Sequence, residues 1–316
     1  MTKIIAELCQ NHNGDKVVLS EMVHAAAEAG AHFAKIQSMR IENLTYRKRF
    51  ELGLIEGGVT KVIKRPYRSE YSRLKNLMLS EKDHGYFIEI CKKYKITPLT
   101  TIFTQDRIKF LESLKLSHIK ISSFDCPSIG LLEKLSKSNF RNVILSTGAS
   151  FNHEIILAKK ILKKKKLSLL HCISIYPTPI ELANINRIHY LKSINEDVGL
   201  SDHSNPDHFG HMVAACALEI GINYIERHFT ILDKKKTKDG IVSVNPKQLK
   251  ELVKISQYSK PEVKEYLISN VGNKKKKLIL GNKYRELSSL ELLNRDYYQG
   301  RFAAKRKKKY YFNWEK

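Results

Sequence analysis

The 316-residue chain has no apolar run that approaches the roughly 18 residues a membrane-spanning helix needs, which argues against a membrane protein. The chain has only five cysteines. An odd number, with no two in the C-x-x-C spacing, argues against a disulfide framework or a cysteine-bound zinc site. The opening segment MTKIIAELC lacks the basic and apolar regions of a signal peptide. These absences predict a cytoplasmic protein with free thiols in a reducing compartment.

Acidic side chains are scarce beside basic ones. The chain holds 56 Lys and Arg against 32 Asp and Glu, which gives a net charge of +24. Part of this excess lies in basic runs at residues 163–166, 234–236, 274–277 and 305–309. Such runs are compatible with a nucleic-acid-binding protein. Aromatic residues alternate with them only in the tail, so we interpret the runs as solvated helix ends and loops and expect no nucleic-acid partner.

Short β-branched runs alternate with longer amphipathic stretches through most of the chain. The predicted strands, each followed by a predicted helix, cover residues 4–9, 33–37, 97–103, 118–122, 143–147, 167–174, 198–201 and 224–229. Eight strand–helix repeats in about 250 residues predict an α/β fold, the (β/α)8 TIM barrel. A doubly wound sheet is the alternative, but the G-x-G-x-x-G and Walker A sequences that such folds often carry are absent.

The alternation stops near residue 258. We therefore expect a barrel domain at residues 1–258 and a lysine-rich C-terminal extension at residues 259–316. The end of the extension carries eight large apolar side chains, and burial of each contributes roughly 1.5–3 kcal/mol. We expect this tail to pack on its own barrel or across a dimer, and to bring Arg295 or Arg301 to a pocket mouth.

Polar residues follow the predicted strands at the end where a barrel places its chemistry. Lys35 and Lys120 lie on otherwise apolar strands, and a buried ammonium group without a partner is costly. Their expected partner is an anionic ligand in the barrel mouth. Together with Ser123, Ser146 and Ser201, the two lysines suit a small molecule that bears phosphate and carboxylate groups.

Two histidines follow the last two predicted strands. His203 and His228 come from neighbouring strand ends, beside Asp202 and Glu226. Single core histidines are usually structural, but a pair at adjacent strand ends is typical of a divalent metal site with open coordination positions.

Seven short segments, in this order between residues 4 and 250, resemble the N-acetylneuraminate (sialic acid) synthase family: IIAELCQNHNG, AKIQ, KISSFDCPS, ILSTGAS, LLHCISIYPTP, GLSDHS and IERHFT. The resemblance implies a barrel enzyme that condenses phosphoenolpyruvate with an N-acetylated hexose, such as N-acetylmannosamine, to give a nonulosonic acid and phosphate. It also implies a divalent metal, Mn²⁺ or Mg²⁺, and a homodimer.

The resemblance assigns roles to individual residues of this chain. The family's metal-binding histidines fall on His203 and His228. Its phosphoenolpyruvate contacts fall on Lys35, Thr101, Lys120, Ser123, Ser146 and Ser201, with a further lysine at Lys274 or Lys275. Its sugar contacts fall on Glu7, Tyr176 and Asp239, and its catalytic groups on Glu7, Lys120, Asp125 and Asp239.

The chain departs from the family pattern around the expected sugar site. Ser122 and Phe124 replace small residues after the fourth strand, and residues 236–239 keep only the aspartate of a P-G-P-D loop. The family's C-terminal antifreeze-like domain has no counterpart, so we expect a short member of the family. Three alternatives stay open: a legionaminate-type, pseudaminate-type or eight-carbon ulosonate acceptor; a non-catalytic barrel or partner subunit; and a nucleic-acid-binding protein.

Overall fold

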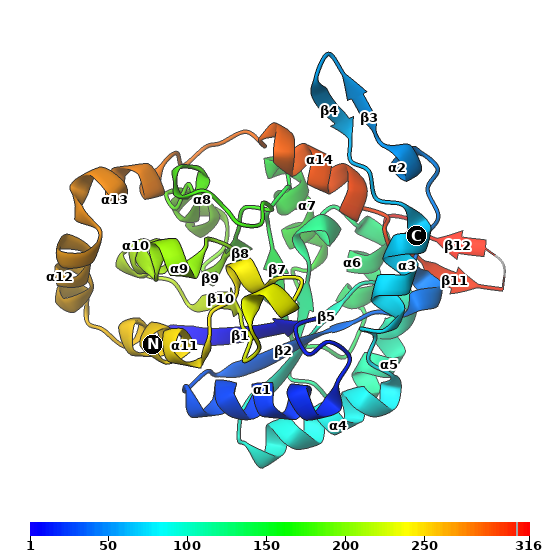
Figure 1. Ribbon diagram of the computed structural model, residues 1–316, viewed down its shortest axis with the longest axis horizontal. Helices are drawn as coiled ribbons and strands as arrows, with labels where there is room; N and C mark the ends of the chain where they lie inside the picture. The colour runs from blue at the N-terminus through cyan, green and yellow to red at the C-terminus, as the bar shows by residue number, and fades with distance from the viewer. Residues whose placement is uncertain (308) are drawn as a thin grey trace.

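The computed structural model describes residues 1–307 and 309–316, in which eight parallel strands close into a barrel (Figure 1). In chain order the strands are β1 (Lys3–Cys9), β2 (Phe33–Ser38), β5 (Thr97–Ile102), β6 (His118–Ile121), β7 (Asn142–Ser146), β8 (Lys166–His171), β9 (Val198–Asp202) and β10 (Tyr224–His228). The barrel closes where β1 pairs with β10, from Lys3 opposite Tyr224 to Glu7 opposite His228. The predicted TIM-barrel fold is confirmed, and each predicted strand overlaps an observed one.

Helices cover the outside of the barrel. They are α1 (Lys16–Glu28), α4 (Glu81–Lys93), α5 (Ile108–Ser113), α6 (Ile129–Ser136), α7 (Asn152–Ile161), α8 (Arg187–Ile194), α9 (Pro206–Phe209), α10 (Met212–Ile220) and α11 (Pro246–Ser256). The main apolar core lies between strands and helices and includes Ile4 and Leu19. A second apolar cluster, which includes Ile5 and Tyr224, fills the amino end of the barrel interior. The opposite, carboxyl end is therefore where polar groups gather.

Two helical segments show how local sequence sets the elements. Ser80 caps α4, because its hydroxyl accepts from the Asp83 N–H while the Asp83 carboxylate accepts from the Ser80 N–H. The single helix expected after the seventh strand is wrong, because the chain breaks there between α9 and α10. Gly210 stands at that break with φ of 50°, a conformation that glycine adopts without steric cost.

The insertion after β2 folds into structure that the sequence pattern did not predict. It contains α2 (Arg49–Leu52), a hairpin of β3 (Leu54–Glu56) and β4 (Val59–Val62), and α3 (Tyr67–Lys75). The hairpin projects from the body of the barrel (Figure 1). Its turn is Gly57–Gly58, both with positive φ, which is a recognisable hairpin sequence.

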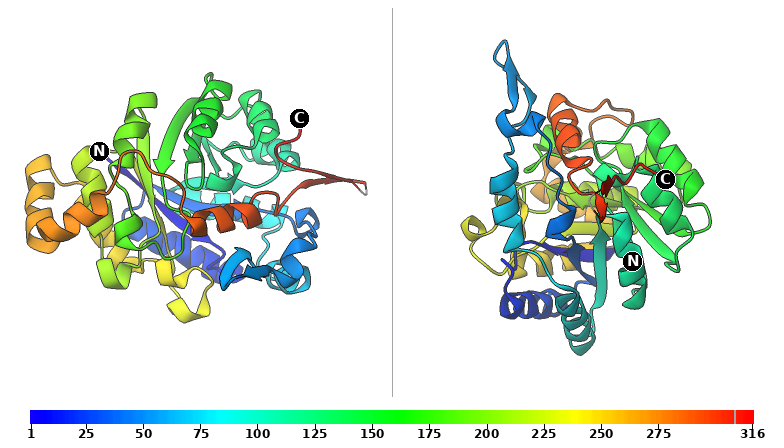
Figure 2. Two further views of the ribbon diagram at one scale, coloured as in Figure 1. Left: turned by 90° about the horizontal axis from the view of Figure 1, so that it is seen from above. Right: turned by 90° about the vertical axis from the view of Figure 1, so that its right-hand side faces the viewer.

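The C-terminal extension packs against the barrel from two sides. Helices α12 (Lys260–Asn270) and α13 (Gly272–Leu280) lie against α10, whereas α14 (Ser289–Tyr298) crosses the barrel mouth (Figure 2). The last segment forms the hairpin β11 (Ala304–Arg306) and β12 (Lys309–Tyr311).

The expectation that the tail packs is confirmed in part: Tyr297 and Phe302 are buried on the chain's own barrel, whereas Leu290, Leu292 and Trp314 are exposed. Asn294 Nδ2 donates to the Ser174 carbonyl at 2.8 Å, which ties α14 to the loop after β8. Within residues 1–307 and 309–316, no helix has the length and apolar character that a membrane crossing requires.

Candidate active site

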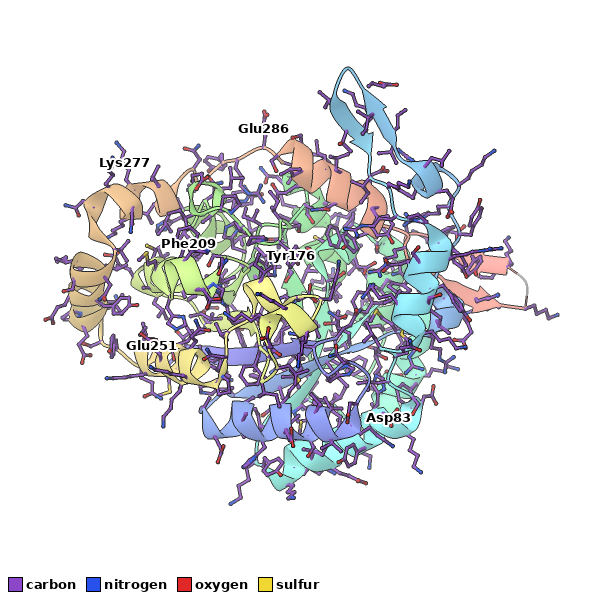
Figure 3. The ribbon with its side chains drawn as sticks, in the orientation of Figure 1. Asp83, Tyr176, Phe209, Glu251, Lys277 and Glu286 are labelled. Carbon is purple, nitrogen blue, oxygen red and sulfur yellow. The ribbon has the colours of Figure 1, made fainter. Side chains whose placement is uncertain are left out.

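A cavity of about 310 Å³ opens at the carboxyl end of the barrel strands. Eleven of the predicted site residues line it: Glu7, Lys35, Thr101, Lys120, Ser123, Ser146, Tyr176, Ser201, His203, His228 and Asp239. Tyr176 lies near the centre of the ring of strands (Figure 3). Strand alternation explains this gathering, because every second side chain points into the barrel and its last inward position lies at the mouth.

A buried network of opposite charges occupies the floor of the cavity. The Lys35 ammonium forms an ion pair with Glu7, lies 3.4 Å from Glu226 Oε2, and donates to Thr101 Oγ1 at 2.9 Å. Lys120 Nζ lies 3.9 Å from Glu226 Oε1 and donates to Ser146 Oγ at 2.6 Å. The expectation that these lysines lack protein partners is therefore wrong, because two glutamates compensate them.

The network sets the charge state of its members. Burial alone would raise the pKa of Glu226, but Lys120 and Lys35 lower that pKa to about 2. Burial lowers the pKa of Lys35, but Glu226 and Glu7 more than offset this and raise it above its ordinary value. The pKa of Lys120 stays lowered, by burial and by repulsion from Lys35, because Glu226 compensates it only in part. Lys120 is therefore the cation most in need of an added anion.

His203 is oriented as a neutral ligand. Its Nδ1–H donates to the Ile173 carbonyl at 2.9 Å, which leaves the Nε2 lone pair for the cavity side, 3.3 Å from Ser201 Oγ. Burial lowers the pKa of His203 to about 3, so the ring is uncharged near neutral pH. The Tyr176 ring packs against it with centroids 4.2 Å apart. A backbone hydrogen bond at the second ring nitrogen is typical of metal-binding histidines.

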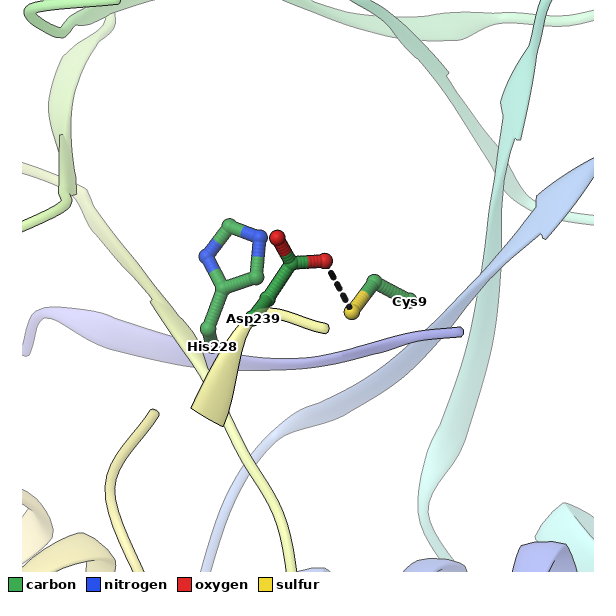
Figure 4. A group of neighbouring side chains, drawn as sticks. All are labelled: Cys9, His228 and Asp239. Atoms are coloured by element: carbon green, nitrogen blue, oxygen red, sulfur yellow. Dashed lines mark hydrogen bonds between the residues drawn. The ribbon is translucent and has the colours of Figure 1, made fainter. Parts of the chain in front are cut away.

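His228 stands next to His203, with ring centroids 5.3 Å apart. Its Nδ1 is buried and has no hydrogen-bond partner among residues 1–307 and 309–316. Ligand atoms of Cys9 and Asp239 lie within 4.8 Å of each other and of a ring nitrogen of His228 (Figure 4). Two adjacent imidazoles, a carboxylate and a sulfur atom form a donor set that fits a divalent metal ion.

Asp125 does not belong to the described cavity lining. Its carboxylate accepts from Ser122 Oγ at 2.9 Å, from Ser128 Oγ at 3.0 Å and from Asn313 Nδ2 at 2.8 Å. The predicted catalytic position of Asp125 is corrected accordingly, because its oxygens close the loop after β6 and hold the end of the chain.

Lys274 and Lys275 also lie away from the cavity. Both are exposed on α13, which packs against α10 and α12 on the outside of the barrel. Lys277 on the same helix marks this peripheral position (Figure 3). The structure thus does not bring Lys274 or Lys275 of the predicted phosphoenolpyruvate site to the cavity, because α13 packs against outer helices and not against the strand ends.

Several lining residues were absent from the predicted set. Glu226 could have been found, because Tyr224, Glu226 and His228 alternate along one strand and share its inward face. Arg73 and Arg301 also line the cavity, from α3 and from the segment after α14. Of the two tail arginines considered, Arg301 reaches the cavity, whereas Arg295 donates to Glu154 Oε2 at 2.8 Å.

The sequence matches the NeuB family over residues 22–265. It is 32% identical over 265 residues to N,N'-diacetyllegionaminic acid synthase of Campylobacter jejuni, across 79% of this chain and 74% of that protein. It is 29% identical over 261 residues to pseudaminic acid synthase of Helicobacter pylori, across 81% and 74% of the two chains. Among solved structures, N-acetylneuraminic acid synthetase of Leptospira borgpetersenii in complex with citrate matches with a TM-score of 0.70. That match has 29% identity and covers 94% of this chain and 90% of the other.

These relatives are synthases of sialic, legionaminic and pseudaminic acids, which confirms the resemblance carried by the seven segments. The family match spans β2 to β10 and therefore includes most of the residues that line the cavity. The chain belongs to the NeuB family.

Proposed function

We propose that this protein condenses phosphoenolpyruvate with an N-acetylated hexose to form a nonulosonic acid and phosphate. The observation that carries the proposal is the buried lysine–glutamate network next to the His203–His228 pair, at the carboxyl end of a NeuB-family barrel. The cavity also has room for two small substrates, at about 310 Å³.

The inner half of the cavity suits phosphoenolpyruvate. Lys120 is only partly compensated, and the hydroxyls of Ser123, Ser146 and Ser201 lie at the carboxyl ends of β6, β7 and β9. A cation with several hydroxyl donors can hold both the carboxylate and the phosphate of this substrate. Held in this way, the substrate presents its carbon 3 toward the outer half of the cavity and the second reactant.

The outer half suits the sugar. Asp239 would accept hydrogen bonds from sugar hydroxyls there, Glu7 would accept them from the floor of the cavity, and Tyr176 forms a wall beside the histidines. Bound at His203 and His228, a divalent ion, Mn²⁺ or Mg²⁺ by family resemblance, supplies Lewis-acid polarisation of the sugar carbonyl. The residues of the network orient the reactants and stabilise developing charge.

The experiment is phosphate release from phosphoenolpyruvate with a divalent metal, against a panel of N-acetylated hexoses and their 6-phosphates. We expect chelator-sensitive release with at least one N-acetylated hexose. The panel also includes acceptors of the legionaminate, pseudaminate and eight-carbon ulosonate types, so that the alternatives are tested together. Absence of release with every acceptor and metal would favour the non-catalytic barrel and overturn the proposal.

Lys120→Met is expected to raise the KM for phosphoenolpyruvate about 10- to 100-fold. A charge-assisted hydrogen bond contributes about 1.5–3 kcal/mol, and Lys120 offers one to the bound anion. Lys274→Met is the matched control, because the same substitution on exposed α13 should leave the kinetics unchanged. Steady-state kinetics with phosphoenolpyruvate varied give the result, and equal effects of the two substitutions would contradict the inner-site assignment.

Deletion of residues 288–316 is expected to raise the KM for the sugar and leave the KM for phosphoenolpyruvate nearly unchanged. Asn294, Tyr298 and Arg301 line the outer cavity and would be lost, whereas Lys35 and Lys120 would remain. The melting temperature should also fall, because burial of Tyr297 and Phe302 is lost at roughly 1.5–3 kcal/mol each. Unchanged kinetics and melting temperature would show that the tail is dispensable. Asn294→Ala supplies the kinetic test if the truncated chain does not fold.

A further inference from the structure

Cys9 is a buried thiol at the carboxyl end of β1, in an unusual backbone conformation. It follows Ile5 and Glu7 in the inward series of β1, is 1% exposed, and has φ of 39°, in the left-handed region that residues other than glycine seldom adopt. This conformation accompanies a register shift between β1 and β2. At the end of the strand the thiol donates to Asp239 Oδ2 at 3.2 Å (Figure 4).

The setting of Cys9 differs from that of the other cysteines. Cys91, Cys126 and Cys216 are packed in the main apolar core, where a thiol acts as a small apolar side chain. Cys172 lines the cavity and accepts a hydrogen bond from the Gly148 N–H. Cys9 alone among the five is hydrogen-bonded to a carboxylate within residues 1–307 and 309–316.

A group of metal-ligating side chains lies at the same place. Cys9 ends β1, His228 ends β10 and Asp239 lies in the loop after β10, so barrel closure brings the three together. Ligand atoms of Cys9, Asp239 and His228 all lie within 4.8 Å of one another. A cation held among these atoms would be bound by sulfur, a carboxylate oxygen and a ring nitrogen, and would replace the thiol–carboxylate hydrogen bond.

We propose that Cys9 and Asp239 join His228 as protein ligands and that His203, with its ring centroid 5.3 Å from that of His228, completes the site, so that the metal site of this chain has four donors, one of them a thiolate. A soft thiolate favours Zn²⁺, Co²⁺ or Fe²⁺ over Mg²⁺. On binding, the Cys9 thiol loses its proton to solvent and a sulfur–metal bond forms, with no change in oxidation state. One Asp239 oxygen binds the ion and the other stays available to a sugar hydroxyl. The inference rests on the proposed metal-dependent synthase and narrows the class of its ion.

Titration of the purified full-length chain with Co²⁺ tests the inference. Thiolate coordination produces a near-ultraviolet sulfur-to-cobalt charge-transfer band, which imidazole and carboxylate ligands do not give. We expect the band in the unmodified chain and its loss in Cys9→Ser, with Co²⁺ affinity lowered by at least about tenfold. Cys172→Ser is the matched control, because Cys172 is a buried thiol that lines the cavity, and it should keep both band and affinity.

Two results would overturn the inference: stoichiometric Co²⁺ bound to the unmodified chain without the band, or a band that survives Cys9→Ser. Either result leaves the proposed synthase intact, because phosphate release is measured separately. Failure of the chain to bind any divalent ion would overturn the metal site of both proposals. If Cys9→Ser does not fold, X-ray absorption of the Zn²⁺-loaded unmodified chain decides, because a sulfur ligand would lie at about 2.3 Å.

Discussion

Replacing either His203 or His228 by alanine should lower the rate of phosphate release by about 10³-fold or more. Lewis-acid polarisation of a carbonyl is worth several kcal/mol, and each 1.36 kcal/mol corresponds to a factor of ten in rate. The loss should persist at saturating metal, because each substitution removes one of the two adjacent imidazoles that would hold the ion. Metal content measured on the purified variants should fall in parallel with the rate.

The fold should survive these substitutions, because both rings lie at the cavity rather than in the apolar core. His189→Ala is the control, since His189 is exposed on α8 and lies outside the described cavity lining. Circular dichroism should show normal folding of both variants. If His203→Ala or His228→Ala then keeps near-normal activity at saturating metal, that histidine is not a metal ligand.

Lys35→Met should destabilise the protein without ligand by about 3–5 kcal/mol. Removal of one partner from a buried ion pair leaves an uncompensated buried charge, and that charge is costly. Here the substitution leaves Glu7 without its cation and leaves Glu226 with only Lys120, at 3.9 Å. Denaturant unfolding of the purified protein gives the free energy.

The double variant Lys35→Met/Glu7→Gln should recover part of this loss, since it removes the stranded carboxylate charge along with the ammonium. Lys275→Met on exposed α13 controls for loss of a lysine in general and should change the unfolding free energy little. Unfolding free energies for Lys35→Met and Lys275→Met that agree within error would mean that the network does not stabilise the folded state.

The fold could be predicted because its signals are local. Strand periodicity and the order of strand–helix repeats depend on residues close in sequence, and the structure confirms both. Polar residues at strand ends also predicted the cavity lining, because barrel closure brings the ends of all eight strands to one mouth. The insertion after β2 escaped prediction because short elements with mixed polarity carry a weak periodic signal.

Side-chain partners could not be predicted in the same way. The sequence segment around Asp125 predicts a catalytic carboxylate. In the structure its oxygens accept hydrogen bonds from neighbouring serines and from Asn313, which is 188 residues away. Lys274, in the basic run at residues 274–277, is predicted to contact phosphoenolpyruvate, yet α13 packs on the outer helices. In each case the deciding contact joins segments far apart in the chain, so no local pattern records it.

The sequence by itself determined the barrel, the cavity at its carboxyl end and the polar residues that line that cavity, because strand alternation and repeat order depend only on neighbouring residues. Tertiary structure alone decided which charges neutralise each other. Lys35 meets Glu226 only because closure of the ring places β10 and β2 on either side of β1. The tertiary structure also decided that Cys9 faces Asp239 and that the tail crosses the mouth of its own barrel. Such pairings follow from the packing of distant segments, and the free energy of a buried charge depends on the neighbour that packing supplies.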